Sequence, residues 1–165
     1  PGWGEAMFVR SEYPDVPLLG YCEFFYRARG ADYGFDPEYA SGPAGLHRLQ
    51  VRKMPHLLAL DDIDAGVCPT EWQRAQFPAE YLHKLDVVHE GIDTDLLAPK
   101  PGAEVTIGDW KLRQGEPIVT YVARNLEPYR GFHTFMRALP ALQKRAPDAR
   151  VVIVGGDEVS YGMRL

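Results

Sequence analysis

Apolar and polar positions follow the most regular pattern in the last third of the chain. The pattern predicts a buried strand over residues 118–123, a helix over 131–145 and a second strand over 151–154. In the predicted helix the apolar side chains form one stripe at helical spacing: Phe132, Phe135, Met136, Leu139 and Leu142. A strand, a helix and a strand in so short a segment favour a right-handed βαβ unit with two parallel strands.

Earlier in the chain the apolar runs are shorter and are separated by loops rich in Gly and Pro. Three of these runs indicate buried strands: residues 17–22, 65–68 and 85–89. The apolar spacing over Leu46–Leu60 predicts a helix that Pro55 breaks or kinks. Thr70 to Gln73 has the form of a capping box, so a helix should begin there, and another short helix is predicted over 78–84.

Composition and charge narrow the classes of function. The 23 acidic and 18 basic side chains give a net charge of −5, which argues against broad nucleic-acid binding but not against a small anionic ligand. Cys22 and Cys68 lie in apolar runs without the spacing of a metal site, and we expect two buried, reduced thiols. No apolar run approaches the roughly 18 residues that predict a membrane-spanning helix.

Residues suited to an anion follow both predicted strands of the last third. Arg124 and Arg130 lie on a loop that leads into the helix at Gly131, and Gly155 and Gly156 follow the second strand. Guanidinium groups match phosphate oxygens, a helix start adds amide donors, and glycines let the backbone approach a ligand. Ligands of parallel α/β sheets bind beyond the carboxyl ends of the strands, so this pattern indicates a diphosphate site.

The same residues have a simpler interpretation. Arg124 and Arg130 would then be surface arginines paired with Glu127, and Gly155–Gly156 would be only a turn. Spacing alone does not decide between the two. The five histidines show no metal-ligand pattern, and no metal site is predicted.

The segment from Val122 to Gly131, followed by 151–156, resembles the start of the C-terminal domain of family 4 retaining glycosyltransferases. In that family a Gly-Arg pair ends the strand and a Lys-Gly pair opens the helix. Ala123-Arg124 and Arg130-Gly131 occupy these positions here, so Ala replaces Gly and Arg replaces Lys. The resemblance implies that Arg124 and Arg130 hold the diphosphate of a donor and stabilise it as it leaves.

Earlier segments resemble the later part of the N-terminal domain of a bacterial subgroup of that family: 1–5, 20–26, 35–38, 69–73 and the crossing segment 89–93. The resemblance implies an α/β fold made of portions of two Rossmann-like parallel-sheet domains, the GT-B arrangement. Residues 1–98 would be the later part of the acceptor-side domain, 99–117 an interdomain linker, and 118–165 the first βαβ unit of the nucleotide-sugar-binding domain. Both chain ends are interpreted as cuts in a longer protein.

The resemblance also implies roles for residues of the first segment. Glu5 and Glu23 are candidates for the catalytic carboxylate that orients or deprotonates an acceptor hydroxyl, and Trp3 and Tyr26 are acceptor-side candidates. The alternatives are a structural hydrogen bond from backbone amides to Glu23 and ordinary packing of Trp3. Gly91 and Asp93 would form the hinge between the domains.

The function implied is transfer of a hexose from a nucleotide-diphosphate sugar to an acceptor hydroxyl with retention, without a cofactor or metal. The acceptor would be a saccharide or a lipid-linked precursor of a bacterial cell-surface polysaccharide or glycolipid. The reaction would take place in the cytoplasm, and the full-length protein would associate peripherally with the inner face of the membrane. The truncated chain would be inactive and would be able to form homodimers through exposed sheet edges.

Two other classes of function compete with this one. Arg124 and Arg130 would equally serve a non-catalytic domain that binds a nucleotide or phosphate and regulates a partner. A dinucleotide-dependent oxidoreductase is disfavoured, because no Gly-x-Gly-x-x-Gly run follows a predicted strand.

Overall fold

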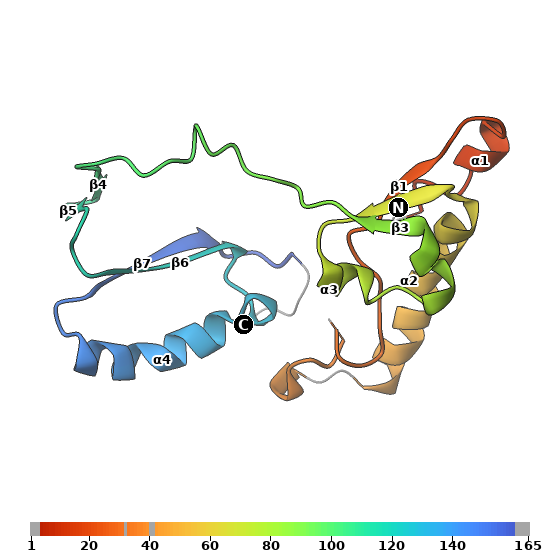
Figure 1. Cartoon of the computed structure of the whole chain (residues 1–165). Coiled ribbons are helices and arrows are strands. Elements are labelled where there is room, and N and C mark those ends of the chain that lie inside the picture. The colour runs from red at the N-terminus through yellow and green to blue at the C-terminus, as the bar shows by residue number, and fades with distance from the viewer. Residues whose placement is uncertain (1–3, 32, 40–41, 161–165) are drawn as a thin grey trace. The chain divides into compact units, whose positions relative to one another are not determined.

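The computed structural model describes residues 4–31, 33–39 and 42–160. The chain divides between Ile92 and Asp93 into two compact units, which are described one at a time (Figure 1). Within the described residues, no helix combines the length and the apolar character needed to cross a lipid bilayer.

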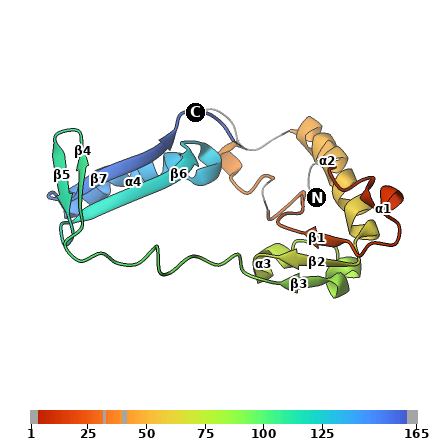
Figure 2. The ribbon, with the colours of Figure 1, turned by 90° about the horizontal axis from the view of Figure 1, so that it is seen from above.

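The first unit contains a three-stranded parallel sheet. Its strands are β1 (Leu19–Tyr21), β2 (Ala65–Cys68) and β3 (Leu85–Val87), in the order β1-β2-β3 (Figure 2). Parallel neighbours require crossover connections, which the helices supply. The connection from β1 to β2 contains η1 (Pro37–Tyr39) and α2 (Pro43–Asp62), and that from β2 to β3 contains α3 (Glu71–Arg74) and η2 (Ala79–Lys84). The short helix α1 (Val9–Glu12) precedes β1. The three predicted strands are confirmed: β2 has the predicted bounds, and β1 and β3 are shorter than their apolar runs.

Helix α2 continues through Pro55, so the predicted break is wrong, and the helix is longer than the predicted range 46–60. A proline inside a helix removes one N–H and leaves the carbonyl four residues earlier without its donor. That carbonyl belongs to Val51, an exposed residue, so water can solvate it. The helix buries its opposite side, with Leu49, Ala59 and Leu60 among the buried residues.

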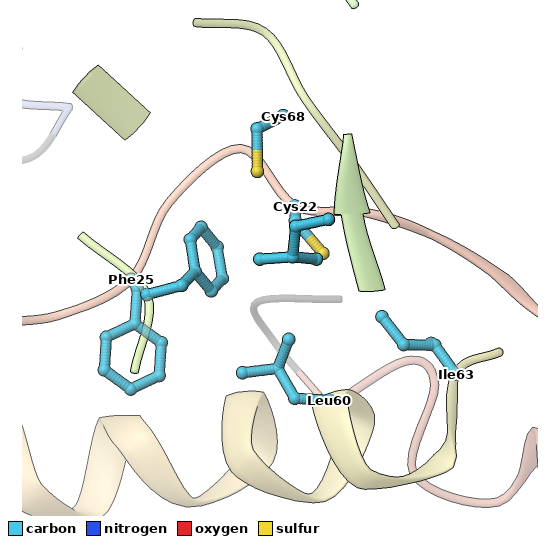
Figure 3. Packing of buried hydrophobic residues seen from close by; sticks show 7 residues of the cluster. Cys22, Phe25, Leu60, Ile63 and Cys68 are labelled. Atoms are coloured by element: carbon cyan, nitrogen blue, oxygen red, sulfur yellow. The ribbon is translucent and has the colours of Figure 1, made fainter. Parts of the chain in front are cut away.

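The core of the first unit lies between α2 and the sheet (Figure 3). Its members are all at most 4% exposed: Cys22, Phe25, Leu60, Ile63, Cys68, Phe77 and Leu85. The two thiols are free and buried, as predicted. Burial raises the pKa of the Cys22 thiol to about 11 and raises that of Cys68 as well, so both remain protonated near neutral pH.

The cap of α3 differs in one detail from the predicted capping box. The Thr70 Oγ1 accepts a hydrogen bond from the Gln73 amide at 3.2 Å, as expected. The Thr70 hydroxyl itself donates to Gln73 Oε1 at 2.7 Å. The Gln side chain therefore accepts from the cap hydroxyl, where a full capping box would have it accept from the cap amide.

The second unit confirms the predicted strand, helix and strand. Strands β6 (Ile118–Asn125) and β7 (Arg150–Gly156) pair in parallel, and the chain between them forms η3 (Pro128–Arg130) and α4 (Phe132–Arg145). Helix α4 lies along one face of the two strands (Figures 1 and 2). Tyr121 of β6 contacts two rings of α4, Phe132 and Phe135, at centroid distances of 5.5 and 4.8 Å.

The stretch 99–117 carries regular structure, where the sequence pattern indicated a polar linker. Strands β4 (Glu104–Ile107) and β5 (Trp110–Arg113) form an antiparallel hairpin and belong to the second compact unit. Gly108 opens its two-residue loop at φ +58°, a conformation that short hairpin loops require. The Arg150 Nη1 donates to the Lys111 carbonyl at 2.9 Å and ties the hairpin to β7.

Candidate donor and acceptor sites

In the second unit, the loops that follow β6 and β7 are joined at the carboxyl edge of the strands. Asn125 pairs with Gly156 after a register shift in β6, and the Leu126 amide donates to the Gly156 carbonyl at 2.9 Å. Parallel α/β sheets bind ligands at this edge. The arrangement therefore brings Arg124 and the loop that leads to Arg130 beside the two glycines. Arg124 lies within β6, where the sequence predicted a loop, because the strand pairs with β7 as far as Asn125.

Both glycines have a packing reason that the sequence interpretation did not include. A Cβ at Gly155 would lie 2.8 Å from the Ala123 carbonyl oxygen, and one at Gly156 would lie 2.6 Å from Asn125 Oδ1. Side chains of other residues do not fit at such distances. The pair belongs to the end of β7, so the interpretation of Gly155–Gly156 as only a turn is wrong.

The two arginines have different surroundings. Arg124 is exposed, and within the described part of the chain its guanidinium has no hydrogen bond or ion pair. The Nε of Arg130 lies 3.7 Å from the Glu127 Oε1, and the Arg130 side chain is 37% exposed. The interpretation as arginines paired with Glu127 therefore holds for Arg130 and not for Arg124.

The backbone around Arg130 is fixed on both sides. The Tyr121 hydroxyl donates to the Arg130 carbonyl at 2.9 Å. Gly131 follows with φ +76°, a left-handed conformation that glycine adopts without strain, and it ends η3 and precedes α4. The first turn of α4 thus begins directly beside Arg130, and its amides add donors for an anion.

Glu127 is the residue that sequence reasoning underrated. Its side chain is 0% exposed, and the Glu127 Oε2 accepts a hydrogen bond from the Ser160 amide at 3.1 Å. Asn125, also buried, donates through Nδ2 to the Ser160 Oγ at 2.5 Å. Glu127 therefore links Arg130 to the loop after β7, and a buried carboxylate needs such partners. Its place between Leu126 and Pro128 gives no pattern that signals burial.

The acceptor-side candidates belong to the first unit. Glu5 and Glu23 are exposed, and Glu23 lies two residues past the end of β1. Within the described residues no hydrogen bond from a backbone amide to Glu23 is found, so its structural alternative is not supported. Trp3 lies outside the described residues.

Tyr26 is buried by neighbouring side chains. Its ring lies 5.1 Å from that of Phe24 and 5.3 Å from that of His56, both edge to face, and the Arg52 guanidinium lies 5.7 Å from its centroid. These contacts hold the Tyr26 ring in one orientation within the first unit. An acceptor-side role for Tyr26 stays a prediction.

The carboxyl edge of β1 and β3 carries one polar contact that the sequence did not indicate. The Tyr21 hydroxyl donates a hydrogen bond to the Glu90 Oε1. This bond, with the nearby carboxylate charge, raises the pKa of Tyr21 to about 12. It joins the end of β1 to the segment after β3, across the central strand β2.

The predicted hinge residues flank the boundary of the two units. Gly91 has φ +78°, and its amide donates to His89 Nδ1 at 3.0 Å. The Asp93 Oδ1 accepts from the amides of Asp95 and Leu96 at 3.1 and 3.0 Å, which makes a local turn. A hinge role for Gly91 and Asp93 stays a prediction.

Comparison with known proteins gives a family for this fold. A family model described as the glycosyl transferase family 4 group matches residues 1–97, more than half of the chain. The chain belongs to that family, and its α/β fold with parallel strands agrees with a Rossmann-like glycosyltransferase fold.

Curated relatives come from mycobacteria. The chain is 32% identical over 98 residues to a GDP-mannose-dependent alpha-(1-6)-phosphatidylinositol monomannoside mannosyltransferase of Mycolicibacterium smegmatis, which is 58% of this chain and 25% of that protein. A protein of the same name from Mycobacterium tuberculosis (strain H37Rv) is 32% identical over 99 residues, with the same two coverages. A D-inositol 3-phosphate glycosyltransferase of Mycobacteroides abscessus is 36% identical over 75 residues, 44% of this chain and 15% of that protein. The chain thus spans about a quarter of the length of the first relatives.

Proposed function

We propose that the protein is a glycosyltransferase that moves a hexose from a nucleotide-diphosphate sugar to an acceptor hydroxyl, with retention of configuration. The proposal rests mainly on the carboxyl edge of β6 and β7, where the segment with Arg124 and Arg130 lies beside Gly155 and Gly156. Family membership and the names of the relatives support it. Because the chain spans about a quarter of those relatives, the activity is proposed for the full-length protein.

The two guanidinium groups would act on the leaving group. When the bond between the sugar and the diphosphate breaks, negative charge grows on the phosphate oxygen. Arg124, exposed and without an ion pair in the described part of the chain, and Arg130, held at its backbone, would neutralise that charge. Electrostatic stabilisation of this kind replaces a divalent metal, so no metal is proposed.

The acceptor would be handled by the first unit. Glu5 or Glu23 would orient or deprotonate the attacking hydroxyl, and Tyr26 would help to form the acceptor site. We propose a saccharide or lipid-linked acceptor used in cell-surface polysaccharide or glycolipid synthesis, at the cytoplasmic face of a membrane. The relatives' names make GDP-mannose the first donor to test.

The direct test is calorimetric titration of the full-length protein with guanosine and uridine diphosphates. An Arg124→Ala, Arg130→Ala double variant should bind at least about a hundredfold more weakly, because each charge-assisted contact contributes about 1.5–3 kcal/mol. Arg145→Ala is the matched control, since Arg145 is an exposed arginine in the last turn of α4. Equal binding by the wild type and the double variant would contradict the donor site.

A further inference from the structure

A second cationic site lies in the first unit, apart from the residues discussed so far. A pocket of about 440 Å³ opens beside the chain that leaves β1. Its lining comes from the loop after β1, from α2 and from the segment after α3: Phe25, Arg27, Ala28, Arg29, Lys53, Gln76 and Pro78. This volume lies within the range of small-molecule sites.

Three of the lining residues are cations, and none of the described lining residues is acidic. Within the described residues, Arg27, Arg29 and Lys53 make no ion pair with a carboxylate. Such a concentration of positive charge is unexpected in a chain whose net charge is −5. A cleft lined by charge of one sign attracts ligands of the opposite sign.

Arg27 is held in place before any ligand arrives. Its Nε donates to the Gln76 carbonyl at 2.6 Å, and its Nη2 donates to the carbonyls of Ala75 and Phe77 at 3.1 and 3.3 Å. A guanidinium has five N–H donors, and these three bonds leave the two on Nη1. Among the described residues no acceptor for Nη1 is found, so a fixed charge with two unused donors lies at the pocket.

The other two cations differ in mobility. The ammonium of Lys53, a half-buried residue on α2, lies 5.8 Å from the centroid of the Phe25 ring. Phe25 belongs to the buried core, so the ring that the Lys53 ammonium faces is held in place. Arg29 is exposed and makes no side-chain hydrogen bond within the described part of the chain. It can therefore turn toward a ligand at little cost.

We propose that this pocket binds a phosphate group carried by the acceptor. Guanidinium forks match the oxygens of phosphate, and the Lys53 ammonium adds a third positive charge from a different element. The assignment of the phosphate to the acceptor rests on the proposed function, because the pocket belongs to the unit that carries Glu5, Glu23 and Tyr26. Binding of phosphate itself rests only on the pocket.

The test isolates the pocket from the donor site. Full-length protein with Arg124→Ala and Arg130→Ala is titrated calorimetrically with inorganic phosphate and with glycerol 3-phosphate. In this background Arg29→Gln or Lys53→Gln should weaken the binding of both probes about tenfold. Arg48→Gln, an exposed arginine of α2 that does not line the pocket, should leave it unchanged. Arg27 is left intact because it holds the 75–77 backbone.

The outcomes separate this site from the proposed function. No binding of either probe, or equal weakening by Arg48→Gln, would overturn the pocket as a phosphate site. If the donor diphosphate still binds through Arg124 and Arg130 in that case, the proposed function stands. Phosphate binding that depends on Arg29 and Lys53, without donor binding in the wild type, would support the pocket and reject the transferase.

A second arm identifies the source of the phosphate. Vesicles that contain phosphatidylinositol are sedimented with the protein and its Arg29→Gln and Lys53→Gln variants. Sedimentation that both substitutions reduce would assign the phosphate to a lipid headgroup. Binding of glycerol 3-phosphate without sedimentation would assign it to a soluble phosphorylated acceptor. Either result supports the pocket, and sedimentation that neither substitution changes would overturn the lipid source.

Discussion

At the scale of single residues, Glu127 connects Arg130 to Ser160, on the loop after β7. Changing Glu127→Gln keeps the size of the side chain but removes the negative charge next to Arg130. We expect the free energy of unfolding to fall by about 1–3 kcal/mol, since the buried amide of the Gln side chain then faces a guanidinium. Diphosphate affinity should also fall, because Arg130 loses the partner that orients it.

Urea unfolding and calorimetric titration measure these two effects. Glu158→Gln is the control, because Glu158 is an exposed carboxylate on the loop after β7. It should leave both quantities almost unchanged. If Glu127→Gln leaves the free energy of unfolding and the diphosphate affinity unchanged, the charge of Glu127 contributes neither to stability nor to the orientation of Arg130.

Tyr21 gives a prediction for alkaline pH. Its pKa is raised from 10.0 to about 12 by the hydrogen bond to Glu90, so the folded state holds the proton more tightly than the unfolded state. The stabilisation is complete below pH 10 and is lost as the pH rises through about 12. Ultraviolet titration of phenolate should lose one late-titrating tyrosine in Tyr21→Phe, whereas Tyr121, whose pKa is also raised by burial, stays late. Glu90→Gln should return the titration of Tyr21 toward the ordinary value, and a titration curve that neither substitution changes would contradict the assignment.

At the scale of secondary-structure elements, the end of β7 depends on the absence of side chains. In Gly155→Ala the new Cβ would lie 2.8 Å from both the Ala123 carbonyl oxygen and the Leu126 Cδ2. The strands must then move apart, and we expect a loss of about 1–3 kcal/mol in the free energy of unfolding. Urea unfolding measures it, with Val154→Ala at the half-exposed neighbouring position as control. If the control loses more stability than Gly155→Ala, the close packing is not the cause.

The elements that sequence could predict are those whose pattern depends on burial. The stripe from Phe132 to Leu142 and the apolar run over 118–123 predicted α4 and β6, and both are confirmed. The hairpin β4–β5 was missed because its strands are mostly exposed, although Gly108 offered a turn signal. At Pro55 the local rule predicted a break or kink, and tertiary packing together with the exposed position of Val51 lets the helix continue.

The candidate site was predictable in its cations but not in its supports. Arg124 and Arg130 were named from their spacing around a strand end and a helix start. The burial of Glu127 and the bonds of Asn125 and Glu127 to Ser160 join residues more than thirty positions apart. No local pattern encodes such contacts. For the same reason the pocket around Arg27 was invisible, since its lining comes from three separate segments.

At the scale of the whole chain, the two faces of the β6–β7 pair differ in what covers them. Side chains alternate along a strand, so Tyr121 points to α4 while Val122 and its partner Val154 point to the opposite face. Val122 is 69% exposed and Val154 is 49% exposed. Parallel sheets in α/β proteins are covered on both faces. The chain spans about a quarter of the length of its relatives, and a protein of their length has residues to cover this face.

A cysteine at Val122 tests that arrangement. In the 165-residue chain, Val122→Cys should react rapidly with a thiol reagent, whereas Cys22 and Cys68 stay slow because they are buried and their pKa values are raised. In the full-length protein, labelling at Val122→Cys should slow by about tenfold or more, as burial makes a thiol inert. Val105→Cys in the exposed strand β4 is the control for reagent access. Equal labelling of Val122→Cys in both lengths would mean that this face of the sheet stays open to solvent, and the second unit would then lack the two-sided cover of a Rossmann-like domain.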